Sequence, residues 1–203
     1  KERPTFLLPF HRDKSKEFIK NNYASNLGKV LAVSLWLGDY DTHISNLGIS
    51  DVNGSFQFVK IDHGWSFAEI QDNMDYNKTP WGLRHGIGKP TNHFADYKQF
   101  GFYKNAEGEF LKMVDSLKLV TREQIQGVLQ EAFKEINKYY SPQAYFTFAK
   151  WIGYPKGALV TEGSLIYYLT NKLMPRARTS LKRREGLPVF RTNTIFDSKG
   201  NDV

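Results

Sequence analysis

The dipeptide Asn53-Gly54 lies between two runs in which apolar and polar residues alternate, ISNLGI (44–49) and FQFVKI (56–61). Asn-Gly is a strong signal for a tight hairpin turn, because both residues tolerate a positive φ angle. Alternation with a period of two is typical of strands that bury one face. The pattern therefore predicts a β-hairpin across residues 44–61.

The stretch SNLGKVLAVSLWLG (25–38), just before the hairpin, is almost continuously apolar. It is too long for an ordinary buried strand, so we expect a buried helix, and Gly38 is a suitable residue to end it.

The other segments divide into extended, irregular and helical regions. Residues 1–10 contain two prolines and predict an extended entry, and a short helix is expected over 13–23. Residues 64–106 contain five glycines and two prolines, which predicts a long irregular segment of the kind that usually has a function. Helices are expected over 107–120, 121–140, 142–153 and 162–174, with a capping box from Thr121 to Gln124, a cap at Ser141 and a stop near Pro175.

Composition narrows the class of protein. The 203 residues are 40% hydrophobic and 24% charged, which is typical of a globular chain with one domain or two small ones. There is no cysteine, so disulfide scaffolds and cysteine-based zinc sites are excluded. Neither an apolar run long enough for a membrane span nor a secretory leader is visible. We expect a cytoplasmic location.

The formal net charge is +7, which suits a partner that carries phosphates or an anionic membrane surface, although many basic proteins bind no polyanion.

Polar residues gather where the predicted helix and strands end. Asp41, His43 and Asn46 link the helix to the first strand, and Asp62 follows the second strand. Because a hairpin returns its second strand beside the start of its first, Asp62 is expected near Asn46 and Asp41. Such a group suits phosphoryl transfer, with Asn46 and Asp62 as oxygen ligands of Mg²⁺, Asp41 as the base, and His43 orienting Asp41 or stabilising charge.

The sequence DTHISN, followed by KIDHG, resembles the catalytic and metal-binding loops of the phosphoinositide 3-/4-kinase family. That family's pattern is Asp-Arg-His-x-x-Asn, a short hairpin, and then Ile-Asp-Phe-Gly. Thr42 and His63 depart from it. The resemblance implies an α+β, mainly helical, kinase-like C-terminal lobe with a small catalytic hairpin. It also implies a phosphoinositide kinase that uses ATP with Mg²⁺ or Mn²⁺.

The same resemblance implies an organisation for the chain. Residues 1–203 would be the C-terminal lobe without its N-terminal lobe, residues 1–12 the inter-lobe connection, and residues 64–100 an activation-like segment. Candidate contacts of this segment with substrate phosphates are Arg84, His85 and Lys89.

A basic stretch closes the predicted helical region and contains Arg176, Arg178, Lys182, Arg183 and Arg184. It suits an anionic membrane surface, a phosphoinositide or another anion, and peripheral membrane association is expected. A solvated helix end that complements its own dipole explains the same residues. Nucleic acid is the last choice, because no nucleic-acid-binding motif accompanies the stretch.

Other readings of these residues stay open at this point. The residues also fit a catalytically incomplete kinase-like domain that binds anionic lipid or inositol phosphate, or an atypical protein kinase. Asp39-x-Asp41 after an apolar run resembles the haloacid dehalogenase phosphatases, and Asp41, His43 and Asp62 suit a metal site in another fold. An ordinary polar turn also accounts for Asp, Asn and Gly here.

Overall fold

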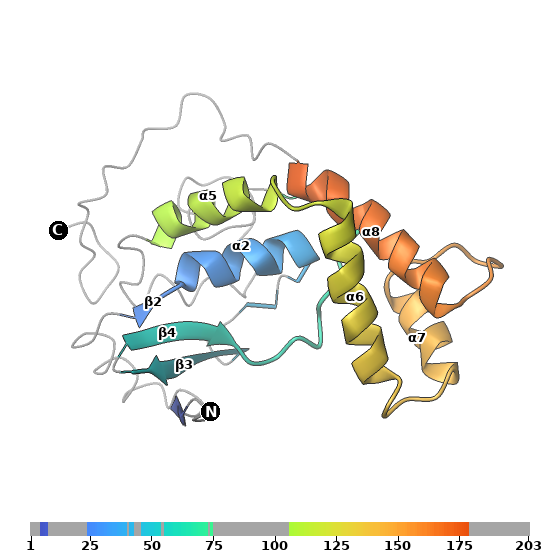
Figure 1. The fold of residues 1–203 in the computed structure, drawn as a ribbon, viewed down its shortest axis with the longest axis horizontal. Helices are drawn as coiled ribbons and strands as arrows, with labels where there is room; N and C mark the ends of the chain where they lie inside the picture. Colours follow the sequence, from blue (N-terminus) through green and yellow to red (C-terminus); the bar gives the residue numbers. More distant parts are fainter. Residues whose placement is uncertain are drawn as a thin grey trace.

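The computed structural model describes residues 5–7, 24–39, 41–42, 46–53, 55–72, 74 and 106–178. This part of the chain has an α+β structure that is mainly helical, with a small sheet beside a group of helices (Figure 1). The predicted α+β, mainly helical class is confirmed. The helix predicted over 13–23 and most of the predicted connection over 1–12 lie outside the described residues.

The sheet is built around the predicted hairpin. Its strands are β1 (Thr5–Leu7), β2 (Ala24–Ser25), β3 (Leu47–Val52) and β4 (Ser55–Lys60), in the order β1-β3-β4-β2. β3 and β4 are antiparallel, with Leu47 opposite Lys60 and Val52 opposite Ser55. Asn53 has φ 54°, as its place in a two-residue turn requires. The tight turn at Asn53-Gly54 is as predicted, and the strands extend beyond the alternating runs toward it, to Val52 and from Ser55.

The predicted buried helix is α2 (Leu27–Leu37), and Gly38 ends it with φ 70°. Helices are normally stabilised by an acidic residue in the first turn and a basic residue in the last turn. α2 has neither. The acid comes from α5 (Ala106–Leu117), where the carboxylate of Glu109 accepts hydrogen bonds from the backbone N–H of Asn26 and of Gly28, each at 3.2 Å.

Three more helices complete the described part: α6 (Arg122–Ile136), α7 (Gln143–Trp151) and α8 (Glu162–Arg178). The predicted capping box starts α6. The backbone N–H of Gln124 donates to the hydroxyl of Thr121 at 3.2 Å, and the N–H of Thr121 donates to Oε1 of Gln124 at 2.9 Å. α7 begins after Pro142 without a side-chain cap, so the predicted capping role of Ser141 was wrong.

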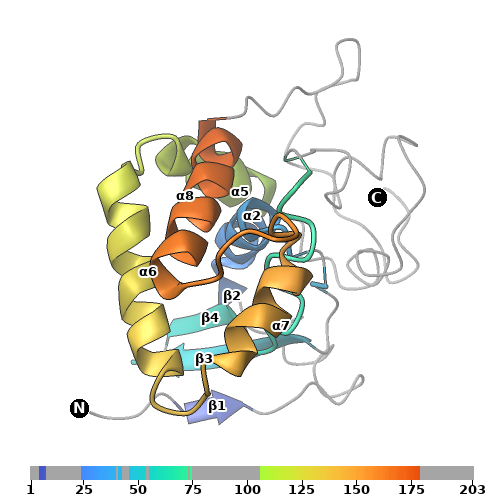
Figure 2. The same cartoon turned by 90° about the vertical axis from the view of Figure 1, so that its right-hand side faces the viewer.

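The helices α6, α7 and α8 share one core. α8 contacts both α6 and α2, and lies between them in Figure 2. The side chains that meet there come from all three helices and from the segment after the hairpin; they include Ile70, Ile125, Leu129, Phe133, Ala149, Ile152, Leu165, Leu169 and Leu173.

The last helix runs further than the sequence predicted. We expected it to stop near Pro175, but α8 includes Pro175 and continues to Arg178. A proline removes one backbone donor and crowds the preceding turn, which usually ends a helix. Here tertiary contacts also stabilise the turn that contains Pro175. Arg176 is 2% exposed, and its guanidinium donates a hydrogen bond to a backbone carbonyl of α2.

Candidate functional site

Two of the predicted site residues are in direct contact. The side-chain amide of Asn46 donates hydrogen bonds to the backbone carbonyl and to Oδ2 of Asp41, both at 2.9 Å. Asn46 is almost buried, at 7% exposure, and directly precedes β3. The amide therefore holds both the backbone and the carboxylate of Asp41.

The hairpin brings Asp62 back to the end of the sheet where Asp41 and Asn46 lie. The N–H of Ile61 donates to the carbonyl of Asn46 at 3.0 Å, which extends the β3–β4 pairing by one residue beyond Lys60. Asp62 is next in the chain and exposed, and its Oδ1 accepts from the N–H of Gly64 at 2.8 Å. The backbone of Asp62 thus lies beside the Asn46–Asp41 contact.

A buried ion pair supports this loop, and sequence reasoning missed it. Asp39 is 1% exposed and pairs with Nζ of Lys60 at 3.4 Å. The same ammonium donates to the carbonyl of Asp41 at 2.9 Å, and the carboxylate of Asp39 accepts from the N–H of Asp41 and from the hydroxyl of Ser66. In the sequence Asp39 is one acid among several, and Lys60 is a strand residue, so nothing marked them as partners.

Oxygen donors suited to Mg²⁺ are present in this cluster, although they are few. Within the described ranges, no three His, Asp or Glu side chains are grouped as a metal site. Mg²⁺ keeps several waters and is commonly held by one or two carboxylates, so Asp41 and Asp62 with the Asn46 amide fit its donor chemistry.

Several predicted site residues lie outside the described part of the chain: His43, Arg84, His85, Lys89, Lys182, Arg183 and Arg184. Of the predicted activation-like segment over 64–100, only residues 64–72 and 74 are described.

The two arginines at the end of α8 have different environments. Arg176 is 2% exposed and donates to the carbonyls of Leu35, Trp36 and Glu69, at 2.6, 2.8 and 3.2 Å. Its guanidinium cannot face a membrane in this position, which corrects the expectation that it belongs to an exposed basic surface. Arg178, two residues later, is exposed.

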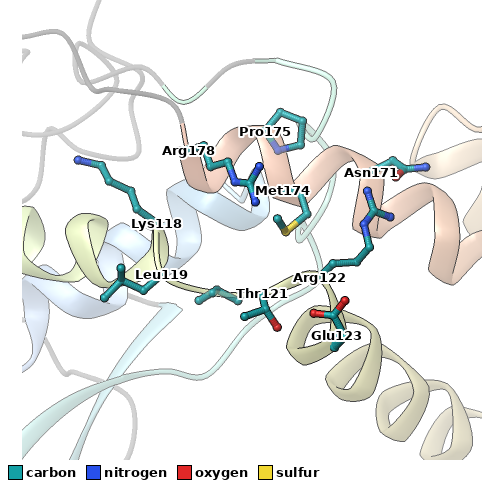
Figure 3. Close-up of a pocket in the computed structure, with 10 residues that line it drawn as sticks. Lys118, Leu119, Thr121, Arg122, Glu123, Asn171, Met174, Pro175 and Arg178 are labelled. Carbon is teal, nitrogen blue, oxygen red and sulfur yellow. The ribbon is translucent and has the colours of Figure 1, made fainter.

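Arg178 contributes to a pocket that sequence reasoning did not predict. The cavity has a volume of about 720 Å³ and lies between the α5–α6 connection, the start of α6 and the last turns of α8. Figure 3 shows Arg122 and Arg178 on either side of Met174, while the side chain of Lys118 extends away from it. We call this cavity the basic pocket, and its walls are Lys118, Leu119, Val120, Thr121, Arg122, Glu123, Asn171, Met174, Pro175 and Arg178.

The basic pocket contains three positive side chains and one negative one. Lys118, Arg122 and Arg178 are positive, and Glu123 is negative. Lys118 also pairs with Asp115 at 2.6 Å on the surface of α5. The backbone N–H of Glu123 itself, then the Thr121 hydroxyl and the nearby Arg122 charge, lower the pKa of the Glu123 carboxyl below 4.5. Glu123 is therefore ionised at neutral pH and the four side chains have a net charge of +2.

The sequence contained a weak signal for this pocket. Lys118 and Arg122 flank the predicted capping box at Thr121, and Asn171 and Arg178 follow on a later helix. Only the packing of α8 against α6 brings the two groups together.

No helix in the described ranges is both long and apolar enough to cross a bilayer.

Comparisons with known proteins give one positive result. No curated protein and no solved structure matches the chain. The family model of the LepB N-terminal domain matches residues 1–180.

This match contradicts the predicted phosphoinositide 3-/4-kinase family, and with it the kinase lobe, the transferase activity and the lipid-kinase and protein-kinase functions drawn from the resemblance. The resemblance depended on a few Asp, Asn and Gly residues, which turn chemistry also favours. Since the matching model covers most of its length, the chain belongs to the LepB N-terminal domain family.

Proposed function

We propose that this domain binds phosphate-bearing anions in the basic pocket, and that its partner is a phosphoinositide or another anionic membrane lipid. The observation that carries the proposal is that Lys118, Arg122 and Arg178, from three separate elements, line one cavity of about 720 Å³. Cavities of about 300–1,000 Å³ are typical of small-molecule sites, so the volume suits a phosphorylated headgroup.

The chemistry of the walls supports an anion rather than a neutral ligand. Arg122 and Arg178 present planar guanidinium groups, which bind phosphate oxygens with paired hydrogen bonds. Lys118 supplies a point charge, and the side-chain amide of Asn171 provides a neutral donor. The start of α6 adds the positive end of a helix dipole on the same side.

The charge of the whole chain supports the same kind of partner. A formal charge of +7 attracts anionic surfaces over a distance of about 10 Å at moderate salt. In the sequence, Lys182, Arg183 and Arg184 follow Arg178 within six residues. Each Lys or Arg close to an anionic leaflet contributes about 1 kcal/mol of attraction.

A calorimetric titration tests the proposal. Inositol trisphosphate and pyrophosphate are the probes, and ATP is a further phosphate-bearing probe. We expect Arg122→Gln and Arg178→Gln each to weaken binding about ten- to hundredfold, and the double variant to lose most of it, since hydrogen bonds to charged groups contribute about 1.5–3 kcal/mol. Added salt should reduce the difference between the variants and the wild type.

The matched control is Lys134→Gln, which removes one exposed positive charge from α6 outside the pocket. It should leave affinity almost unchanged. Equal losses for Lys134→Gln and Arg178→Gln would mean that net charge, not the pocket, attracts the probes.

A second candidate function is binding of Mg²⁺ by Asp41, Asn46 and Asp62. The observation that favours it is the 2.9 Å contact of Asn46 with Asp41 beside the backbone of Asp62. Calorimetry with Mg²⁺, and spin resonance with Mn²⁺, should show at least a tenfold weaker affinity for Asp62→Asn than for the wild type. Equal affinities for the variant and the wild type would show that Asp62 is not a ligand of the ion.

A further inference from the structure

Leu119 is 81% exposed although it is a large apolar residue in the wall of the basic pocket. We propose that Leu119 inserts into the interface of an anionic bilayer while lipid phosphates occupy the basic pocket beside it. This inference rests on the proposed function and adds to it an apolar membrane anchor beside the pocket.

The exposure of Leu119 is fixed by the backbone around it. In the α5–α6 connection, the N–H of Leu119 donates to the carbonyl of Ser116, and the N–H of Val120 donates to that of Leu117, both at 3.1 Å. The side chain of Leu117 is 3% exposed and anchors the connection in the core. The capping box of α6 begins two residues after Leu119, at Thr121. These constraints present the leucine outward before any partner arrives.

The surroundings of Leu119 match the chemistry of a membrane interface. Lys118 precedes it in the chain, and Arg122 and Arg178 line the cavity whose wall contains it, so this part of the surface combines an apolar side chain with cationic groups. Anionic headgroups attract these cations, and the acyl region just below accepts the leucine. A free phosphate satisfies the cations but leaves Leu119 in water.

Leu159 shows that exposure alone does not select a site. It is 79% exposed in the connection between α7 and α8, near the opposite end of α8 from the basic pocket. Single exposed leucines are common on protein surfaces. Leu159 lies outside the basic pocket, so it is a matched control for Leu119.

The absence of cysteine from the chain makes a direct test available. Leu119→Cys and Leu159→Cys each introduce a single thiol that takes an environment-sensitive fluorophore. Vesicles of phosphatidylcholine with a phosphoinositide should shift the emission of the label at position 119 to the blue, and lipids with a quencher in the acyl chain should quench it. Vesicles of phosphatidylcholine alone should do neither, and the label at position 159 should stay unchanged. The same emission from both labels on phosphoinositide vesicles overturns the proposal.

An unlabelled variant separates this inference from the proposed function. Leu119→Ala should bind phosphoinositide vesicles about three- to tenfold more weakly, because part of the transfer free energy of the side chain is lost. It should bind inositol trisphosphate as the wild type does. If the wild type fails to bind inositol trisphosphate, the proposed function fails. If it binds that probe but Leu119→Ala binds vesicles as tightly as the wild type, only the insertion of Leu119 is refuted.

Discussion

Nη2 of Arg176 donates a hydrogen bond of 2.6 Å to the backbone carbonyl of Leu35, across 141 positions of sequence. The same guanidinium bonds the carbonyl of Trp36, while the indole N–H of Trp36 donates to the carbonyl of Leu173 at 3.0 Å. The C-terminal turn of α2, which has no basic residue of its own, thus receives its positive charge from α8.

Replacing Arg176 with methionine should lower the free energy of unfolding by about 3 kcal/mol, because methionine keeps an apolar stem but leaves buried carbonyl groups without their charged donor. Denaturant unfolding measures this loss. Arg178→Met is the control, since Arg178 is exposed and its loss should change stability by less than about 0.5 kcal/mol. Similar losses for both variants would contradict the structural role of Arg176.

Gly28 should not tolerate alanine. A Cβ atom there would lie 2.0 Å from the carbonyl oxygen of Ala106 and 2.5 Å from the amide nitrogen of Phe110, both backbone atoms of α5. We expect Gly28→Ala to destabilise the fold by about 3 kcal/mol through overpacking. In contrast, a Cβ atom at Gly127 in α6 has no neighbour within 4 Å, so Gly127→Ala should stabilise by up to about 1 kcal/mol. Thermal unfolding of both variants should give shifts of opposite sign.

Removing one partner of the buried Asp39–Lys60 pair should be costly. Their side chains are 1% and 5% exposed, so Lys60→Met leaves a carboxylate buried without its counter-ion. The expected loss of unfolding free energy is about 3–5 kcal/mol. The double variant Asp39→Asn with Lys60→Met should be more stable than Lys60→Met alone. A double variant that is equally or less stable would show that the charge of Asp39 is not the source of the cost.

Glu123 should weaken anion binding at neutral pH. Its pKa is lowered mainly by its own backbone N–H, and then by the Thr121 hydroxyl and Arg122. Its carboxyl group therefore stays ionised at pH values below its ordinary pKa of 4.5, and its negative charge repels an anion in the basic pocket. Glu123→Gln should raise the affinity for a sulfated inositol about threefold, as expected for the loss of one exposed charge.

The pH dependence of this binding follows from the same carboxyl group. As pH falls through the lowered pKa, protonation of Glu123 raises the net charge of the pocket and should increase wild-type affinity. The contribution of ionised Glu123 to stability has the opposite trend: it is present above the unfolded-state pKa and lost as pH falls through the folded-state pKa. Calorimetry over a pH series tests the binding, because the sulfate groups do not titrate in this range. The rise should be smaller in Glu123→Gln, where only other carboxylates such as Asp115 beside Lys118 still titrate, and an equal rise in both proteins would contradict the assignment.

Local sequence signals correctly predicted the secondary structure at positions where neighbouring residues determine it. Asn53 with its positive φ angle formed the hairpin turn, the Thr121–Gln124 capping box started α6, and the apolar run ending at Gly38 formed α2. The same kind of reasoning failed at Pro175. A proline normally ends a helix, but α8 continues through it, and Arg176 ties this turn to α2.

The hairpin also predicted which side chains return to one end of the sheet, and Asp41 and Asn46 are in contact there. The family was not predictable from that motif, because Asp, Asn and Gly are common in turns for reasons of backbone conformation alone. The match to the LepB N-terminal domain depends on a much longer stretch, residues 1–180.

The sequence by itself determined the helices and the hairpin, because their signals lie within a few residues of one another. Only the tertiary structure decided that Glu109 and Arg176 support the two ends of α2, and that Arg122 and Arg178 face one cavity. These partners come from separate helices, up to 141 positions apart. Charge and hydrogen bonding act over a few ångströms in space, so their partners are set by how the helices pack and not by their order in the chain.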